Sequence, residues 1–207
     1  MYKGMVSYKA VIFDLGRVLV NFDFQRGYRA LEGLCPYSAA EIPVRIRSSG
    51  LVRRFETGLI GPRDFYAQFS ELLGLSIDYS RFCEIWTCIF TEALLPESLL
   101  ESLAARYRLV LLSNTNPIHF ETIRAAYPHL RHFHRLVLSH EVKAMKPQPE
   151  IYRAAINAAE CRPEECFFTD DIPEYVEGAR RMGIDAVQFE SREQIERELI
   201  ARGIAVT

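Results

Sequence analysis

Short, almost entirely hydrophobic runs alternate along this chain with helical patterns, and this alternation constrains the fold more than any other feature. Such runs are typical of strands that are buried on both faces of a parallel sheet. The predicted strands are Ala10–Phe13, Leu109–Leu112, Leu136–Leu138, Cys166–Phe168 and Ala186–Phe189. The predicted helices are Glu97–Arg106, Pro117–Ala126, Pro149–Ala159, Glu174–Met182 and Arg192–Ala201. The order predicts an α/β fold with a Rossmann-like, doubly wound parallel sheet.

The segment from about Phe22 to Leu95 interrupts this alternation, because it contains no convincing strand and several amphipathic helical patterns. An insert directly after the first strand would lie over the carboxyl edge of the sheet, where α/β proteins bind ligands. We therefore predict an α/β core of residues 1–21 and 96–207 and an inserted helical cap of residues 22–95. Phe65, Phe69, Phe82 and Trp86 are interpreted as the core of this cap rather than as ligand contacts.

Composition excludes several classes of function. The formal net charge is −2, so no basic field indicates a nucleic-acid partner. No apolar run approaches the roughly 20 residues that span a membrane. The N-terminus lacks the apolar stretch and cleavage site of a signal peptide. The five cysteines form no CxxC pair and are expected to be reduced, mostly buried thiols of a cytoplasmic protein.

Four of the predicted strands end in polar side chains that should meet at one edge of the sheet. These are Asp14, then Ser113, Asn114 and Thr115, then Lys143 and Lys146, and finally Asp170 and Asp171. Crowded carboxylates raise one another's pKa unless a cation lies among them, and oxygen ligands of this kind suit Mg²⁺. The hydroxyl, amide and ammonium groups suit an anion such as phosphate.

Each of these residues alone could be a turn residue, a helix cap or a solvated charge. Their occurrence at four successive strand ends favours a shared chemistry. A hard cation beside anion donors and a free carboxylate indicates phosphoryl transfer to an aspartate nucleophile.

The motifs "VIFDLG", "LLSNT", "KPQPEIY" and "FFTDD" resemble those of the haloacid dehalogenase superfamily of hydrolases, in the same order. The stretches "FETGLIGPRDF" and "EIWTCIF" resemble that superfamily's small helical cap, of four-helix-bundle type. "FDLGRVLVNFDF" is similar to a subgroup of sugar-phosphate phosphatases that includes bacterial α-glucose-1-phosphatase. The resemblance implies a Mg²⁺-dependent phosphatase of small phosphomonoesters, with sugar phosphates among the candidate substrates.

The resemblance also implies a role for each motif residue. Asp14 would be the nucleophile and Lys146 would neutralise charge, with Lys143 a weaker candidate for that lysine. The implied metal ligands are Asp14, the Gly16 carbonyl, Asp170 and Asp171. The implied substrate-binding residues are Ser113, Asn114, Gly16 and Arg17.

Two residues depart from the pattern of the superfamily. Gly16 stands where the commonest phosphatase motif has an aspartate as general acid, and Tyr175 stands where close relatives have asparagine. Loss of a positioned acid typically costs about 10²–10⁴-fold in rate. We therefore expect either slow turnover or a preference for leaving groups that depart readily as anions, such as those of sugar-1-phosphates and acyl phosphates.

Two alternatives remain open. The chain could be a 2-haloacid dehalogenase, although the dehalogenases of this superfamily carry tyrosine at the position of Gly16 and need no metal. It could also be a catalytically impaired module that binds phosphate ligands.

Two further groups of charged or titratable residues stand out in the sequence. His129, His132 and His134 lack the spacing of a helical metal pair and are interpreted as surface or partly buried residues. Arg45, Arg47, Arg53 and Arg54 form a basic patch in the predicted cap, which could steer an anionic substrate.

Overall fold

A five-stranded parallel sheet forms the centre of the computed structural model. The structure describes residues 7–206. The prediction that the chain lacks a signal peptide rests partly on residues 1–6, which lie outside this range. The strand order is β5 (Arg135–Leu138), β4 (Arg108–Ser113), β1 (Ala10–Phe13), β6 (Cys166–Asp170) and β7 (Asp185–Gln188). All neighbouring pairs are parallel. The α/β prediction is confirmed, and each predicted strand has a counterpart within two residues at either end.

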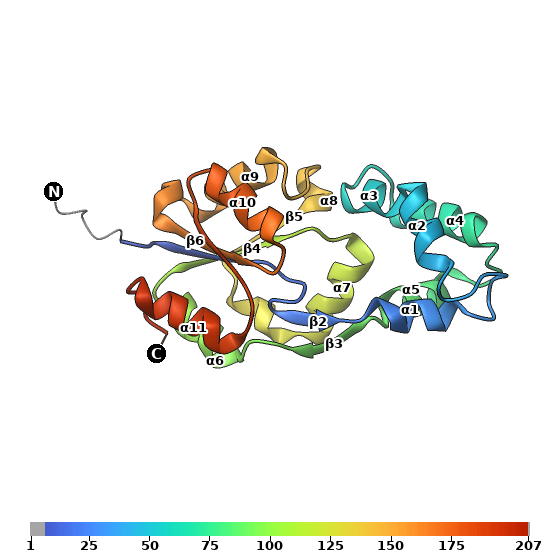
Figure 1. Cartoon of the computed structure of the whole chain (residues 1–207), viewed down its shortest axis with the longest axis horizontal. Helices are drawn as coiled ribbons and strands as arrows, with labels where there is room; N and C mark the ends of the chain where they lie inside the picture. Colours follow the sequence, from blue (N-terminus) through green and yellow to red (C-terminus); the bar gives the residue numbers. More distant parts are fainter. Residues whose placement is uncertain (1–6, 207) are drawn as a thin grey trace.

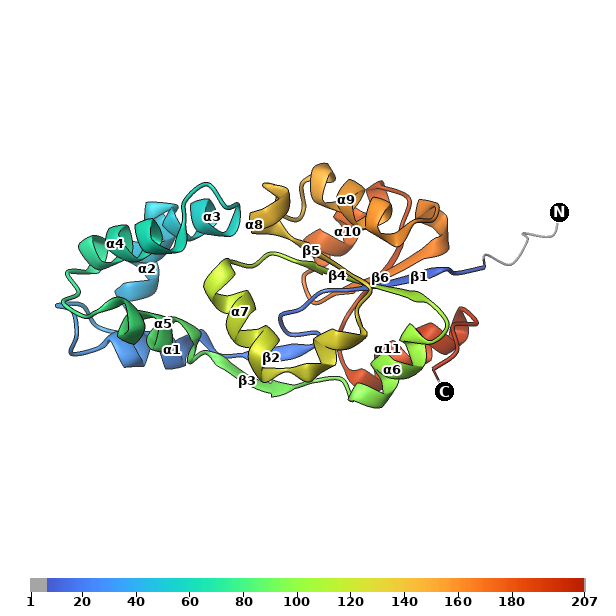
Figure 2. The ribbon, with the colours of Figure 1, turned by 180° about the vertical axis from the view of Figure 1, so that it is seen from behind.

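Helices cover both faces of the sheet (Figures 1 and 2). One face carries α9 (Pro149–Ala159) and α10 (Pro173–Arg181); the other carries α6 (Glu97–Ala104), α7 (Pro117–Ala126) and α11 (Arg192–Ala201). Alternate residues of β1 point to opposite sides, so Val11 and Phe13 belong to one core cluster while Ala10 and Ile12 belong to the other. Burial on both faces is why the strands are continuously hydrophobic. The short helical turns are η1 (Pro128–His132), α8 (Ser139–Val142) and η2 (Pro163–Glu165).

The helices that follow β2 and precede β3 in the sequence form a layer beyond one end of the sheet (Figure 1). Its helices are α1 (Phe24–Leu31), α2 (Ile42–Ser49), α3 (Leu51–Glu56), α4 (Pro62–Leu73) and α5 (Tyr79–Thr87). Their core is aromatic, with Phe55 stacked on Phe65 at a centroid distance of 4.1 Å and Phe69 and Phe82 packed beside them. We call α1–α5 the cap and keep the division at residues 22–95 as a proposal.

The prediction that the insert contains no strand is wrong. β2 (Val20–Phe22) and β3 (Phe90–Ala93) form an antiparallel ribbon, in which Val20 pairs with Ala93 and Phe22 with Phe90. The ribbon is short and β3 is half-buried or exposed, so it lacks the hydrophobic run that identifies a buried strand. Backbone hydrogen bonds between segments about 70 residues apart therefore bring the two ends of the insert together.

None of the helices in residues 7–206 is long and apolar enough to span a membrane. All five cysteines are free thiols, as expected. Only Cys166 is buried, however, and the other four are half-buried, so the expectation of mostly buried thiols is wrong.

Gly178 of α10 packs directly against Tyr152 of α9, whose hydroxyl donates to the Tyr175 carbonyl at 2.7 Å. A Cβ at position 178 would lie 2.5 Å from that hydroxyl oxygen. We expect Gly178→Ala to lower the free energy of unfolding by about 1–3 kcal/mol, because the buried tyrosine must move. Denaturant unfolding measures this.

Adding Tyr152→Phe should recover part of the loss, because it removes the closest atom. Glu177→Ala, on the exposed side of the same helix, is the control and should change stability little. Unchanged stability of Gly178→Ala would contradict the packing described.

Candidate active site

The central strands bring the predicted motif residues to one edge of the sheet. Asp14 directly follows β1, Ser113 ends β4 and Asp170 ends β6. Phe13 is level with Leu111 on one side and with Thr169 on the other, so the three strands end together. All three polar side chains are buried, and the two carboxylates among them need partners for their charges.

Lys146 supplies that partner. Its Nζ lies 2.5 Å from Asp14 Oδ1 and 2.5 Å from Asp170 Oδ2, and it also donates to the Leu112 carbonyl at 3.2 Å. Burial acts to lower the pKa of Lys146, but the two carboxylates outweigh it and hold the pKa above its usual value. The lysine is therefore a fixed positive charge between two buried carboxylates.

One carboxylate cluster has the spacing of a metal site. Oxygen atoms of Asp14, Asp170 and Asp171 lie within 4.8 Å of one another, with the first two side chains buried and the third half-buried. Burial raises the pKa of Asp14 to about 7, and Asp170 adds to the rise while Lys146 opposes it. A buried acidic cluster that one lysine only partly neutralises fits a divalent cation with oxygen ligands, such as Mg²⁺.

No other group of three His, Cys, Asp or Glu side chains in residues 7–206 has this spacing. Two of the three histidines singled out in the sequence have separate partners, and the buried His129 Nδ1 has no hydrogen-bond partner in residues 7–206. His132 Nε2 lies 3.0 Å from Glu97 Oε1, and His134 Nδ1 accepts from the Leu109 N–H at 3.0 Å.

The loop after β4 holds the lysine loop in place. Asn114 Oδ1 accepts from the Lys146 N–H at 2.8 Å, and its Nδ2 donates to the Lys146 carbonyl at 3.1 Å. The Asn114 side chain is thus committed to positioning Lys146, which leaves its backbone available to a ligand. Lys143, the weaker candidate, instead donates to the Gly58 carbonyl of the cap at 2.7 Å.

The ring of Phe22 lies directly against Gly16 in the motif that contains Asp14. A Cβ at Gly16 would lie 2.7 Å from Phe22 Cε1, so the ring occupies the space that a side chain at position 16 would need. Arg17 has a φ of +59° and its guanidinium lies 5.0 Å from the centroid of the same ring. Burial and the neighbouring Asp170 raise the pKa of Asp171, and the Arg17 charge opposes this rise.

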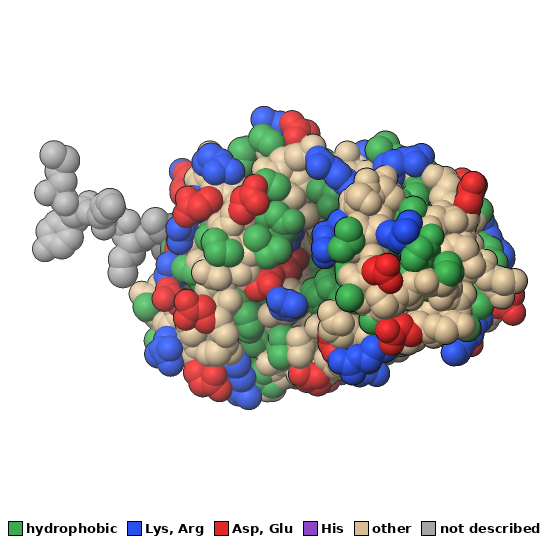
Figure 3. All heavy atoms as spheres, turned by 45° about the vertical axis from the view of Figure 1, so that its right-hand side comes forward, with side chains coloured by type: hydrophobic (Ala, Val, Ile, Leu, Met, Phe, Trp, Pro, Cys, Tyr) green, Lys and Arg blue, Asp and Glu red, His purple; other side chains and the backbone are tan. Residues whose placement is uncertain are grey.

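A cavity of about 590 Å³ runs from Lys146 into the cap. Figure 3 shows the hollow between core and cap, with acidic and hydrophobic side chains at its edge. Trp86, Phe69 and Phe82 line this cavity, so their interpretation as cap core alone was incomplete. Arg47 and Arg53 of the basic patch also line it.

The remaining two arginines of the basic patch have other contacts. The Arg45 guanidinium lies 3.6 Å from the Tyr37 ring centroid, and Arg54 donates to Gln68 Oε1 at 3.0 Å.

Three side chains at this cavity were not predicted as functional. Tyr175 accepts from Asn114 Nδ2 at 3.4 Å, and its ring centroid lies 5.2 Å from Lys146 Nζ. His119 is paired with the Trp86 carbonyl at 2.9 Å, and burial lowers its pKa to about 4, so it is neutral. Burial raises the pKa of Glu56 to about 7. Only Tyr175 carried a sequence signal, as a departure from a motif; Glu56 and His119 had none.

Comparison with known proteins agrees with this geometry. The haloacid dehalogenase-like hydrolase family matches residues 8–183. The chain is 26% identical over 198 residues to the D-ribitol-5-phosphate phosphatase of Bacteroides thetaiotaomicron, covering 92% of this chain and 96% of that protein.

Solved structures show the same likeness. A HAD family enzyme from Bacteroides thetaiotaomicron, in complex with magnesium and inorganic phosphate, has a TM-score of 0.81 and 29% identity over 90% of this chain and 96% of that chain. L-2-haloacid dehalogenase from Xanthobacter autotrophicus, at a TM-score of 0.61 and 23% identity over 96% of this chain and 84% of that one, shares the fold. With the family match extending over most of its length, this chain belongs to the haloacid dehalogenase-like hydrolases.

Proposed function

We propose that the protein is a Mg²⁺-dependent phosphatase that hydrolyses small phosphomonoesters through an aspartyl-phosphate on Asp14. The observation that carries this proposal is the buried Lys146 ammonium between Asp14 and Asp170, with Asp171 completing a cluster of metal-ligand spacing. A carboxylate that keeps one oxygen free beside a fixed ammonium is suited to attack an anionic phosphoryl group.

In the first step, an Asp14 oxygen attacks phosphorus and the bond to the leaving oxygen breaks. Lys146 stabilises the charge between the nucleophile and the phosphoryl oxygens, and Ser113 with the Asn114 backbone donates to those oxygens. Water then attacks the aspartyl-phosphate, releasing phosphate and restoring Asp14. Asp14, the Gly16 carbonyl, Asp170 and Asp171 would hold Mg²⁺, which supplies electrostatic stabilisation of the phosphoryl charge.

The relatives support the substrate class. One is named a D-ribitol-5-phosphate phosphatase, and another was crystallised with magnesium and inorganic phosphate. We propose a small phosphorylated metabolite as the partner and the cytoplasm as the location, where free thiols such as those of this chain remain reduced.

Two alternatives are less well supported. A metal-free dehalogenase would have no use for the cluster of Asp14, Asp170 and Asp171. A non-catalytic binding module would not need a nucleophile paired with a buried lysine. Chloride release from 2-chloropropionate would favour the first alternative, and tight phosphate-ester binding without turnover would favour the second.

We expect phosphate release from a panel of phosphomonoesters to require Mg²⁺. Treatment with EDTA should abolish turnover, because the carboxylate cluster would then carry uncompensated negative charge opposite the phosphate. Adding Mg²⁺ in excess should restore it, as measured by released inorganic phosphate. Full activity in EDTA would contradict the proposal.

We expect Asp14→Asn to reduce turnover by about 10⁴-fold or more, because the nucleophile is lost. Acid quenching of the wild type during turnover should trap a protein whose mass is increased by one phosphoryl group, located on Asp14 by peptide mapping. Asp64→Asn on the exposed surface of α4 is the matched control and should retain activity. Equal activity of both variants would exclude Asp14 as the nucleophile.

A further inference from the structure

The cavity changes character along its length. At the catalytic end it is lined by Lys146, Gln148, Glu174 and Tyr175. In the cap most of its walls are hydrophobic side chains, among them Phe24, Ile46, Val52, Phe82, Ile85 and Trp86, and the polar side chains there are Tyr28, Arg47, Arg53 and Glu56. A volume of about 590 Å³ lies within the range of small-molecule sites.

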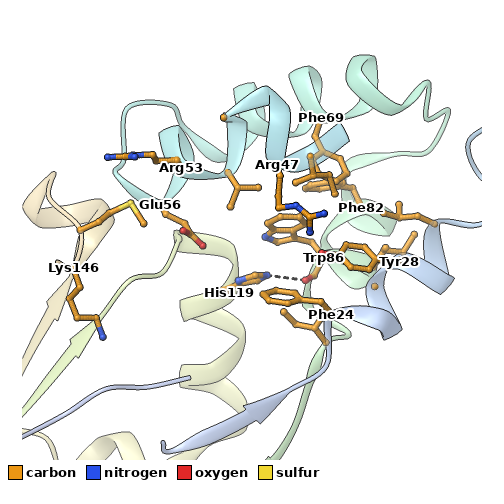
Figure 4. A pocket seen from close by; sticks show the side chains of 18 of the residues that line it. Phe24, Tyr28, Arg47, Arg53, Glu56, Phe69, Phe82, Trp86, His119 and Lys146 are labelled. Carbon is orange, nitrogen blue, oxygen red and sulfur yellow. Dashed lines mark hydrogen bonds between the residues drawn. The ribbon is translucent and has the colours of Figure 1, made fainter. Parts of the chain in front are cut away.

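Stacked and edge-to-face aromatic rings form part of the cavity wall in the cap. Trp86 is stacked between Phe82, at a centroid distance of 6.0 Å, and His119, at 5.0 Å (Figure 4). Phe65 and Phe69 support Trp86 from the cap core at centroid distances of 4.9 and 5.3 Å. A hydroxyl buried against these rings without a partner would be strongly disfavoured, whereas a hydrophobic group would be favoured there.

We propose that this cavity binds the alcohol part of the phosphomonoester substrate and that this part is mainly hydrophobic, at least the size of one ring. The proposal rests on the phosphatase function, because Lys146 at one end of the cavity fixes where the phosphoryl group lies. A substrate of this kind would distinguish the protein from a phosphatase that selects a polyol phosphate.

Trp86 is the only tryptophan in the chain, so its fluorescence reports binding without any need for turnover. We would titrate Asp14→Asn with methyl, n-butyl and n-hexyl phosphate and with D-ribitol 5-phosphate, in the presence of Mg²⁺. The dissociation constant should fall about two- to fourfold per added methylene until the cavity is filled. Ribitol phosphate should bind more weakly than hexyl phosphate.

Val52→Asp places a charge in the cavity wall and should remove this dependence on chain length. Val44→Asp adds the same charge on the exposed face of α2 and should preserve it. Equal affinity along the series, or tightest binding of ribitol phosphate, would overturn the inference. Chain-length dependence without turnover in the wild type would instead overturn the phosphatase proposal alone.

A second inference concerns the proton that the leaving oxygen needs. Gly16 cannot donate it, and Phe22 fills the space in which a longer side chain would lie. Glu56, the last residue of α3, lines the cavity together with Lys146 and Tyr175. Figure 4 shows its carboxylate pointing into the space between Lys146 and His119.

The backbone of Glu56 is tied directly to the core. Its carbonyl accepts from Ser139 Oγ at 2.6 Å, and Ser139 Oγ also accepts from the Thr115 N–H at 2.9 Å, in the loop that follows Ser113. Within residues 7–206 the Glu56 carboxyl group itself has no hydrogen-bond or ion-pair partner. The residue is half-buried, and its desolvation without a compensating partner raises its pKa to about 7.

We infer that Glu56 donates a proton to the leaving oxygen. As Asp14 forms its bond to phosphorus, the bond from phosphorus to the leaving oxygen breaks and that oxygen takes the Glu56 proton, so the product leaves as a neutral alcohol. When water attacks the aspartyl-phosphate, the Glu56 carboxylate takes a proton from the water. Each cycle thus consumes one ester and one water and returns Glu56 to its protonated form.

The test uses two esters that differ in the acidity of the leaving group. Benzyl phosphate releases an alcohol that needs a proton, whereas phenyl phosphate releases a phenol that departs readily as an anion. Glu56→Gln should lower kcat for benzyl phosphate by about 10²–10⁴-fold and for phenyl phosphate by less than about tenfold. Glu71→Gln, on the exposed face of α4, is the control and should leave both unchanged.

In the wild type, kcat for benzyl phosphate should fall as the pH rises through about 7, because only protonated Glu56 can donate, and Glu56→Gln should lose this step. The other charged or titratable groups that line the cavity are Tyr28, Arg47, Arg53, His119, Lys146, Glu174 and Tyr175. The helices packed on α3, which are α2, α4 and α8, add Arg45, Arg63, Asp64, Tyr66, Glu71, His140 and Glu141. Equal losses for the two esters would assign Glu56 a structural role and overturn the inference. No turnover of either ester by the wild type would overturn the phosphatase proposal itself.

Discussion

The ion triad of Asp14, Lys146 and Asp170 is the interaction on which the rest of the active site depends. Two buried carboxylates at the ends of neighbouring strands would repel each other strongly, and the lysine lies within hydrogen-bond distance of both. Its position is fixed by the Asn114 side chain, which binds the Lys146 backbone through both its oxygen and its nitrogen. The loop after β4 therefore places the ammonium, and the ammonium allows the carboxylates to stay close.

Much of the core could be predicted from the sequence because its signals are local. Strands buried on both faces read as hydrophobic runs, and three helices, Pro117–Ala126, Pro149–Ala159 and Arg192–Ala201, have the predicted bounds. The convergence of Asp14, Lys146 and Asp170 followed from the rule that parallel strands end at one edge. The β2–β3 ribbon could not be predicted in this way, since it is short, partly exposed and held by contacts distant in sequence.

The cavity shows a second limit of sequence reasoning. Trp86 and Phe82 have the spacing of core residues and are core residues, yet one side of each also faces the cavity. Periodicity identifies the buried face of a helix but not whether a neighbouring side chain or empty space adjoins it. Glu56 was missed for a related reason, because its environment is created by α3 approaching α8, an arrangement that no motif encodes.

The β2–β3 ribbon has a consequence for how this architecture can vary. By pairing Val20 with Ala93, the ribbon fixes the two points at which the chain leaves and re-enters the core next to each other. The entropic cost of closing a loop rises only slowly with loop length, by about 0.6 kcal/mol for each doubling. A chain built in this way can exchange the segment between β2 and β3 for a longer or shorter one with little disturbance to the sheet. Such an exchange would replace the cavity walls in the cap and Glu56, which lie beyond the ribbon, while Asp14, Lys146 and Asp170 would stay in place on the sheet.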